Sequence, residues 1–206
     1  MDLEAIRADY EKRYPQLREL SERLEANVKG LLRGVPHIDR IYFRAKEPRK
    51  FVQKCAKGAG SAYEHPLSEI EDQVAGRVLV FFLDDIEAAV SLLRRHFTTV
   101  ESVRKTPEKH DAFGYESFHC VFTIPPQVKP ADWHLVSDPP VTFEMQVRTL
   151  FQHAWAEPQH GLGYKGDPAT PREALRELAW AAASAWGADH AIQRALTIIR
   201  GGKSDA

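Results

Sequence analysis

The sequence predicts an α+β (α/β) fold, in which a mixed β-sheet of about five strands has helices packed on one face and further helices at both termini. Three segments alternate between apolar and polar residues, as strands with one buried face do; they are residues 38–46, 115–124 and 141–148. A fourth segment, residues 74–83, is apolar almost throughout and is expected to form a central strand. Apolar residues at three- and four-residue intervals predict the terminal helices.

The bulk composition is that of an ordinary globular domain, which we expect to span residues 1–206. Hydrophobic residues make up 43% of the chain and charged residues 28%, and the formal net charge is −1. This balance argues against a protein that coats nucleic acid through a generally basic surface. No apolar run approaches the roughly 18 residues of a membrane span, the N-terminus lacks a secretory pattern, and two cysteines suit a reducing compartment. We therefore expect a cytoplasmic protein without membrane contact.

The first predicted element is a helix within residues 1–36. Its apolar stripe consists of Leu17, Leu20, Leu24, Val28 and Leu31. Gly34 and Pro36 are expected to end this helix, because neither residue suits a helix interior. The first alternating strand follows at residues 38–46, and Pro48 suits the first turn of a second helix.

Strands and helices are expected to alternate through the middle of the chain. After the apolar strand, Asp84 or Asp85 could cap a helix. The buried stripe of that helix would be Ile86, Val90, Leu93 and Phe97. A further strand is predicted near residues 99–105, and the proline-rich residues 125–140 connect the last two alternating strands.

The predicted core spans residues 38–165 and closes with a short helix near residues 149–157. Pro158 would stop that helix, because proline lacks the backbone donor of a helix interior. Residues 170–200 are predicted to be helical again, and Gly187 could interrupt this C-terminal stretch.

The polar faces of the alternating strands carry side chains of three chemical kinds. They are Arg40, Arg44 and Lys46 from the first strand, Tyr115 and His119 from the second, and Glu144, Gln146 and Arg148 from the third. Cations suit a polyphosphate, an aromatic ring suits a nucleobase, and a carboxylate suits Mg²⁺. Asp72, just before the apolar strand, adds a second carboxylate. Phosphoryl-type transfer needs such a set, although one face of an antiparallel sheet can also simply face solvent.

Four segments, in the same order along the chain, resemble the synthetase domain of the RelA/SpoT family across residues 38–165. YFRAKEPRKFVQK resembles the family's R-x-K-x(7)-K stretch, and EDQVAGRVLVFF resembles its D-x(4)-R strand entry. FGYESFH resembles its G-Y-x-S-x-H segment, and FEMQVRTLFQHAWAEPQHGLGYK resembles its E-x-Q-x-R-T strand with the following helix. The resemblance implies a nucleotidyltransferase-like fold.

The same resemblance implies a reaction and a role for each matching residue. The expected reaction moves the β,γ-pyrophosphate of ATP to the 3′-hydroxyl of GDP or GTP, giving the alarmone (p)ppGpp, with Mg²⁺ as cofactor. The implied ATP ligands are Arg44, Lys46, Lys54 and Arg77. The implied catalytic and metal-binding residues are Asp72 and Glu144. The implied acceptor contacts are Tyr115, with its ring against the base, His119 and Gln146.

The sequence departs from the family pattern on the acceptor side. Where the family usually has a lysine four residues before the motif tyrosine, this chain has Asp111, so that Lys105 or Lys109 would have to substitute. The acceptor therefore stays open. One alternative is a toxic relative, with an antitoxin as partner, that pyrophosphorylates the 3′ end of tRNA or makes (p)ppApp. Another is an inactive nucleotide-sensing module, which the presence of both Asp72 and Glu144 disfavours.

Two further expectations concern assembly and metals. Small relatives of this kind are often homo-oligomers, and the C-terminal helices could pair. His153, Glu157 and His160 fall close together, but their spacing is not that of H-E-x-x-H and Pro158 separates the last two. We therefore expect no zinc site there.

Overall fold

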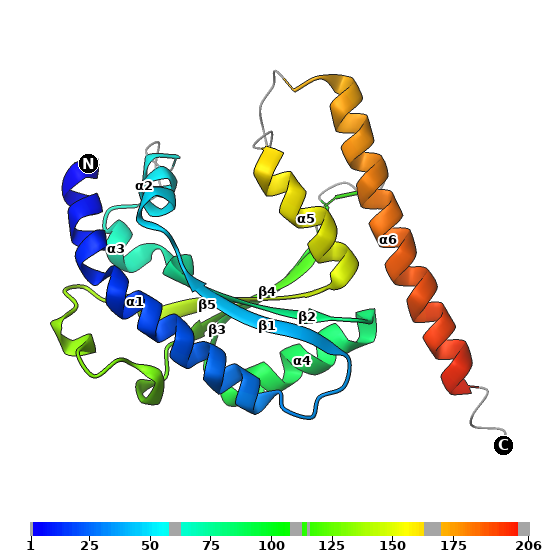
Figure 1. The fold of residues 1–206 in the computed structure, drawn as a ribbon, viewed down its shortest axis with the longest axis horizontal. Coiled ribbons are helices and arrows are strands. Elements are labelled where there is room, and N and C mark those ends of the chain that lie inside the picture. Colours follow the sequence, from blue (N-terminus) through cyan, green and yellow to red (C-terminus); the bar gives the residue numbers. More distant parts are fainter. Residues whose placement is uncertain (1, 58–62, 108–112, 115, 163–169, 202–206) are drawn as a thin grey trace.

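The computed structural model describes most of the chain and contains a single mixed sheet (Figure 1). The described residues are 2–57, 63–107, 113–114, 116–162 (backbone alone for 159–162) and 170–201. The strands among them are β1 Ile38–Ala45, β2 Val74–Val80, β3 Thr99–Lys105, β4 Ser117–Thr123 and β5 Thr142–Thr149. Their order is β1-β2-β5-β4-β3, in which β2 and β5 are parallel and the other neighbours antiparallel. The predicted fold class is confirmed.

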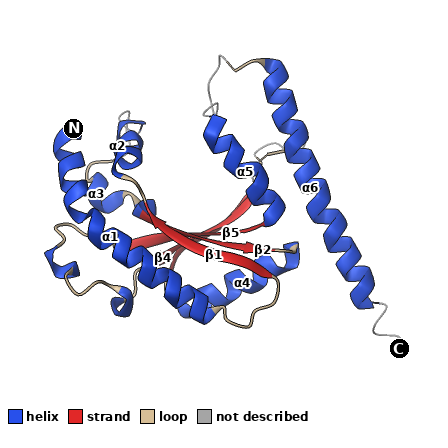
Figure 2. Cartoon of the chain, viewed as in Figure 1, coloured by secondary structure: helices blue, strands red, loops and turns tan. Residues whose placement is uncertain are grey.

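Helices cover one face of the sheet and leave the centre of the other face open. The α-helices among the described residues are α1 Leu3–Leu31, α2 Pro48–Lys57, α3 Pro66–Glu69, α4 Leu83–His96, α5 Leu150–Leu162 and α6 Arg172–Gly201. α1 and α4 pack against the covered face. α2 follows β1 and α5 follows β5, and these strands end at opposite ends of the sheet, so the two helices rise on either side of the open face (Figures 1 and 2). None of the described helices is both long and apolar enough to span a bilayer.

The apolar core lies between the sheet and helices α1 and α4. α1 contributes Leu17, Leu20, Leu24 and Val28, all fully buried. The sheet contributes alternate residues of its strands, among them Phe43 and Ala45 of β1 and Phe143, Met145 and Val147 of β5. Because side chains alternate across a strand, this burial turns the residues between them toward the open face.

Gly76 on β2 makes room for the ring of Phe43 on the neighbouring strand. A Cβ atom at position 76 would lie only 2.5–2.7 Å from the outer ring atoms of Phe43. The Phe43 ring also lies 6.1 Å, centroid to centroid, from the ring of Phe143, inside the buried layer. A side chain at position 76 would therefore displace packed aromatic rings.

The proline-rich connection before β5 is held against α1 by one buried arginine. The guanidinium of Arg13 donates hydrogen bonds to the backbone carbonyl oxygens of Leu67 at 3.2 Å, Ser137 at 2.5 Å and Asp138 at 2.9 Å. Figure 2 shows this connection as loops with short helical segments, outside the sheet. Arg13 is 5% exposed, and its role was not predicted from the sequence.

Three local expectations were wrong. Phe82 occupies the N-cap of α4 without a side-chain hydrogen bond, and Asp84 and Asp85 lie in the first turn, where negative charge favours the helix dipole. α5 continues to Leu162 with Pro158 inside it, although an interior proline removes one backbone hydrogen bond and crowds the preceding turn. α6 is continuous through Gly187, because one glycine costs a helix only about 1 kcal/mol.

Replacement of Gly76 with alanine is expected to lower the free energy of unfolding by about 1–3 kcal/mol, because an added carbon in a packed core forces its neighbours to move. Denaturant unfolding followed by circular dichroism measures this change. The matched control is Gly187→Ala in α6, where an added Cβ meets nothing within 4 Å. It should raise the free energy of unfolding by about 0.5–1 kcal/mol. A Gly76→Ala protein as stable as the wild type would contradict the close contact with Phe43.

Candidate functional site

The register of the sheet aligns polar side chains from distant parts of the sequence on the open face. One row across the strands consists of Tyr42, Arg77, Gln146 and His119. The next row consists of Arg44, Ala75 and Glu144. Residues paired across neighbouring strands face the same side of a sheet, so both rows lie on the open face. The small side chain of Ala75 lies at the centre of the second row and leaves space above the sheet.

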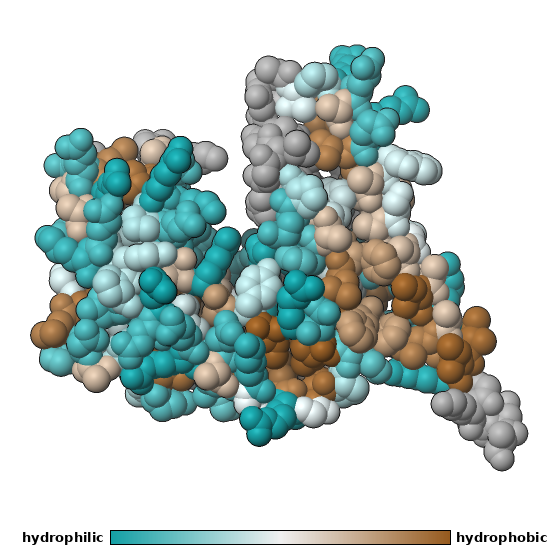
Figure 3. Space-filling model, in the orientation of Figure 1, coloured by the Kyte–Doolittle hydropathy of each residue, from teal (hydrophilic) through white to brown (hydrophobic). Residues whose placement is uncertain are grey.

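A cavity lies at this place on the open face. Its lining residues are Tyr42, Arg44, Lys46, Asp72, Ala75, Gly76, Arg77, Glu144 and Gln146. In the space-filling view, a notch between the part formed by α1 and α2 and the part formed by α5 and α6 opens toward the same side (Figure 3). The cavity therefore brings together residues of β1, β2 and β5 and the turn before β2.

Two lysines share one carboxylate at the edge of the cavity. Lys46 Nζ lies 2.8 Å from Asp72 Oδ2, and Lys54 Nζ lies 2.9 Å from Asp72 Oδ1. Burial disfavours the charged form of Lys54, but the charge of Asp72 and its hydrogen bond raise the pKa of the lysine above its usual value. Asp72 thus holds the ammonium groups of Lys46 and Lys54 close together where β1, α2 and β2 meet.

Glu144 is a partly buried carboxylate that remains ionised. Burial opposes its charge, but hydrogen bonds from His119 and Gln146 outweigh this effect and lower its pKa to about 2. His119 Nδ1 lies 2.8 Å from Glu144 Oε1, and Gln146 Nε2 donates to the same oxygen at 2.8 Å. The charge of Lys105 on β3 lowers the pKa further. Glu144 therefore presents a fixed negative charge at neutral pH.

A buried arginine fixes the orientation of Gln146. Arg148, which is fully buried, donates a hydrogen bond to Gln146 Oε1. The amide nitrogen of Gln146 then points toward Glu144, so the three side chains of β5 form a chain of hydrogen bonds along one face of the strand. The sequence placed Arg148 on the polar face but gave it no role.

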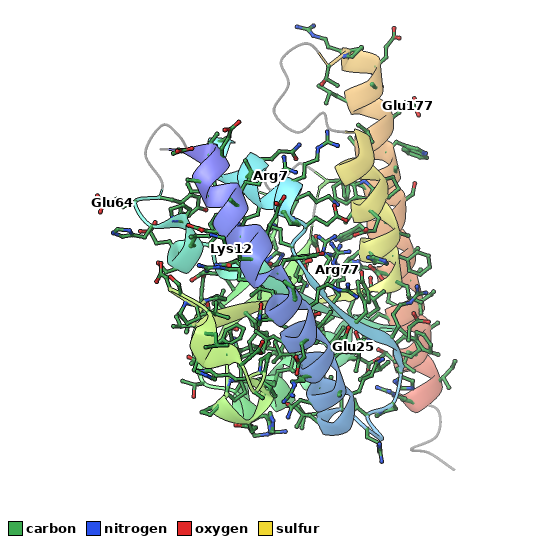
Figure 4. All side chains as sticks on the ribbon, turned by 60° about the vertical axis from the view of Figure 1, so that its left-hand side comes forward. Arg7, Lys12, Glu25, Glu64, Arg77 and Glu177 are labelled. Atoms are coloured by element: carbon green, nitrogen blue, oxygen red, sulfur yellow. The ribbon has the colours of Figure 1, made fainter. Side chains whose placement is uncertain are left out.

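Arg77 is held between β1 and α5. It donates a 2.8 Å hydrogen bond to the hydroxyl of Tyr42 and pairs with the carboxylate of Glu157 on α5. Figure 4 shows Arg77 in this position, between the strand and the helix. Burial opposes the charge of Glu157, but the neighbouring Arg77 and His153 lower the pKa of its carboxyl below the usual range. Glu157 therefore serves as the counter-charge of a nearly buried cation.

Sequence reasoning did not find this role for Glu157, which entered only as a member of a rejected zinc motif. A signal was present, because an arginine in the middle of an apolar strand needs a counter-charge when it is buried. The sequence does not say which acid supplies it. His153 lies on the same side of α5, with Nδ1 at 3.7 Å from Glu157 Oε1, and burial next to Arg148 lowers its pKa.

The structure brings together most of the residues predicted for the site. Those that line the cavity are Arg44, Lys46, Asp72, Arg77, Glu144 and Gln146. Lys54 joins them through Asp72, and His119 joins them through Glu144. Tyr115, the predicted platform for the acceptor base, lies outside the described residues, as does Asp111.

The two carboxylates of the cavity fit a Mg²⁺ ion that arrives with a nucleotide. Mg²⁺ usually binds one or two carboxylates together with substrate phosphates and water. Asp72 and Glu144 border the same cavity, and the low pKa of Glu144 keeps its oxygens available as ligands. Among the described residues, no group of three or more His, Cys, Asp or Glu could hold a metal ion by itself. The oxygens of a bound phosphate would have to complete the coordination.

The site lies within a recognisable family region. The family model for the region found in RelA / SpoT proteins matches residues 43–169. The chain belongs to the RelA/SpoT family. The matched region includes every residue that the four sequence segments placed in the site, from Arg44 to Gln146, and this family is the one that those segments predicted.

Individual members of the RelA/SpoT family are similar over most of the chain. GTP pyrophosphokinase YjbM of Bacillus subtilis (strain 168) is 32% identical over 159 residues, which cover 72% of this chain and 70% of that protein. The crystal structure of the small alarmone synthetase 1 from Bacillus subtilis has a TM-score of 0.73 at 25% identity and covers 96% of this chain and 98% of that chain. The structure of that synthetase bound to its product pppGpp has a TM-score of 0.74 at 24% identity, with 93% and 98% covered.

Replacement of His119 with alanine is expected to raise the pKa of Glu144 above its value of about 2. The substitution removes the hydrogen bond and the charge of His119, which lower this pKa, and leaves the burial that raises it. A carboxyl ¹³C NMR titration of the labelled protein measures the pKa directly. A depressed pKa stabilises the fold above the unfolded value, and this contribution is lost as the pH falls toward 2. The variant should therefore lose less stability than the wild type on acidification.

The control for this titration is His134→Ala, an exposed residue of the proline-rich connection that contacts the backbone of Ala131. It should leave the titration of Glu144 unchanged. An unaltered Glu144 pKa in the His119→Ala protein would show that His119 does not hold the carboxylate in its ionised form.

Proposed function

We propose that this protein is a pyrophosphokinase that transfers the β,γ-pyrophosphate of ATP to the 3′-hydroxyl of GDP or GTP, giving (p)ppGpp. One observation carries the proposal. In a chain of the RelA/SpoT family, a cluster of cations around Asp72 and an ionised Glu144 with its own hydrogen-bond donors border a single cavity. The similarity to proteins named GTP pyrophosphokinase and small alarmone synthetase supports the choice of reaction.

The ATP side of the proposed site is the half formed by β1, α2 and β2. Its cations are Arg44, Lys46, Lys54 and Arg77. A triphosphate is stabilised by several charged donors at once, and such donors are more effective when their positions are fixed beforehand. Asp72 holds the two lysines, and Glu157 holds Arg77. Asp72 and Glu144 would hold Mg²⁺, which supplies positive charge to the transferred phosphates.

The acceptor side is the half formed by β4 and β5, with Glu144, Gln146 and His119. A general base works best when its pKa lies near the working pH, and a carboxyl with a pKa of about 2 is a weak base at neutral pH. We therefore assign to Glu144 the orientation of the 3′-hydroxyl and the binding of Mg²⁺, rather than full removal of the proton. Tyr115 would stack on the acceptor base.

Product analysis with labelled ATP tests the proposal. GDP, GTP, ATP and deacylated tRNA are offered as acceptors side by side, and a pyrophosphorylated guanine nucleotide is the expected product. Product with tRNA alone would move the assignment to the tRNA-modifying alternative with an antitoxin partner, and product with ATP alone would move it to (p)ppApp synthesis. No product with any acceptor would contradict the reaction itself and favour the nucleotide-sensing module.

The same assay tests the assignment of Glu144. Glu144→Gln keeps the shape and removes the charge, so turnover is expected to fall by about two orders of magnitude or more, as when a charged transition-state contact is lost. Circular dichroism should show an intact fold. The control is Glu173→Gln on the exposed side of α6, which should retain wild-type turnover. Near-normal turnover of Glu144→Gln would remove the residue from the centre of the site.

We propose further that the protein is a homo-oligomer that pairs through α6. The outer side of this helix exposes large apolar side chains, with Trp180 at 72% and Ile198 at 74% exposure. These residues are 18 positions apart, which is five turns, so they lie on one face together with small alanines. Figure 3 shows apolar side chains gathered over the lower half of α6.

The double substitution Trp180→Glu and Ile198→Glu is expected to convert an oligomer into monomers, because a charge in an apolar interface is costly. Sedimentation velocity measures the change in mass. A wild-type protein that sediments as a monomer at all concentrations would contradict this proposal, whereas an oligomer that survives the double substitution would place the interface elsewhere.

A further inference from the structure

The long helix α6 has few buried side chains, and one of them is a carboxylate. Ala182 and Asp189 are the buried residues of α6. A buried carboxylate costs free energy unless partners offset the lost hydration. Asp189 is only partly compensated, since its Oδ1 atom is buried without a hydrogen-bond partner in the described part of the chain. Burial raises its pKa to about 6. An apolar side chain would serve packing better, so the acid calls for a different explanation.

The partner of Asp189 is the residue that joins β5 to α5. Thr149 Oγ1 donates a 2.7 Å hydrogen bond to Asp189 Oδ2, and both side chains are buried. Thr149 is the last residue of β5, and α5 begins at the next position. The contact therefore ties the C-terminal helix to the junction between two elements that carry site residues.

Thr149 also caps α5, and the contact with Asp189 sets the geometry of that cap. The backbone N–H of Gln152 donates to Thr149 Oγ1 at 3.1 Å, and the backbone N–H of Thr149 donates to Gln152 Oε1 at 3.1 Å. This reciprocal pair is a capping box. A hydroxyl has one hydrogen and two lone pairs, so donation to Asp189 directs the lone pairs toward Gln152. Asp189 thereby selects the hydroxyl rotamer that the cap needs.

The direction in which α5 leaves β5 decides where Glu157 lies. Glu157 is eight residues beyond Thr149, and at 1.5 Å per residue this corresponds to about 12 Å along the helix. A change of about 10° in the helix direction would shift Glu157 by about 2 Å, more than a hydrogen bond tolerates. Glu157 would then lose Arg77, which it holds on the ATP side of the cavity.

We propose that Asp189 is a positioning residue for the ATP half of the site: through the Thr149 cap it fixes the direction of α5 and so keeps Glu157 against Arg77. The inference rests on the proposed function only in naming ATP as the ligand of Arg77. Two more contacts hold α6 in place for this role. Trp155 Nε1 of α5 donates to the carbonyl oxygen of Leu178 at 3.3 Å, and Gln193 Nε2 donates to Asp84 Oδ2 of α4 at 2.6 Å.

Asp189→Leu separates positioning from stability. Leucine has nearly the same shape. It removes a buried, partly unpaired carboxylate but also leaves the buried Thr149 hydroxyl without its acceptor, so the two effects oppose each other and the free energy of unfolding should change little. The affinity for ATP should nevertheless fall. We expect kcat/KM for ATP to drop by about tenfold to a hundredfold, the range that a displacement of about 1 Å can produce, while KM for the acceptor stays unchanged. Asp189→Asn retains an acceptor for Thr149 and should restore kcat/KM for ATP to within about threefold of wild type, as expected when one hydrogen bond is only weakened.

A double-mutant comparison tests whether Asp189 acts through Glu157. The Kd for a non-hydrolysable ATP analogue, measured by calorimetry, is compared for Asp189→Leu alone, Glu157→Gln alone and the double variant. If Asp189 acts through Glu157, its substitution adds little once Glu157 is changed. The control is Ser184→Ala, which removes an exposed hydrogen bond within α6, from Ser184 Oγ to the carbonyl oxygen of Trp180, and leaves Thr149 untouched; its Kd should equal that of the wild type.

Wild-type affinity for the analogue in Asp189→Leu would overturn the inference, and so would full additivity with Glu157→Gln. Asp189→Leu could also lose affinity only in proportion to a loss of stability, without rescue by Asp189→Asn. That result would show that Asp189 has only a structural role. The binding measurement needs no acceptor. A failure of the proposed reaction, seen as absence of product in the wild type, is therefore distinct from a failure of this inference.

Discussion

The parallel pairing of β2 with β5 is the constraint on which the site depends. These strands are separated by more than sixty residues, and their register places Ala75 beside Glu144 and Arg77 beside Gln146. A shift of one residue would turn every side chain of one strand to the other face. The apolar residues of both strands are buried against α1 and α4, so such a shift would expose the core. The hydrophobic core thus fixes the register, and the register assembles the charged residues.

The charged residues of the open face are held by one another. Asp72 pairs with Lys46 and Lys54, Glu144 pairs with His119, and Arg77 pairs with Glu157. Each pair joins different elements, so the pairs also brace α2, β4 and α5 against the central strands. Their side chains hold one another in position, and charges in fixed positions need little reorganisation during a reaction. This ordering explains why a site rich in buried charge is compatible with a stable fold.

The sequence predicted what depends on local periodicity and missed what depends on tertiary contacts. Alternation identified β1, β4 and β5, and their polar faces supplied Glu144, Gln146 and His119. Asp72 was found from its place just before the apolar strand, and the family segments added Lys54; neither residue lies on an alternating strand. Glu157 and Asp189 escaped, because both lie on helices whose direction is set by contacts that no short-range pattern encodes. Pro158 and Gly187 misled the prediction of helix ends, since local propensity was outweighed by the packing of α5 against α6.

The hydrogen bonds around Glu144 make its carboxylate a weaker base and at the same time fix its orientation. The donors that lower its pKa to about 2 also fix the position of its oxygens, and the two effects cannot be separated. A stronger base would need fewer donors and would then be free to rotate. A loose transition state needs little help from a base, because in it the bond to the leaving group is largely broken before the attacking hydroxyl loses its proton. Position matters more for such a reaction, and in the proposed mechanism the hydrogen-bonded side chains of Arg148, Gln146 and Glu144 along β5 would supply it.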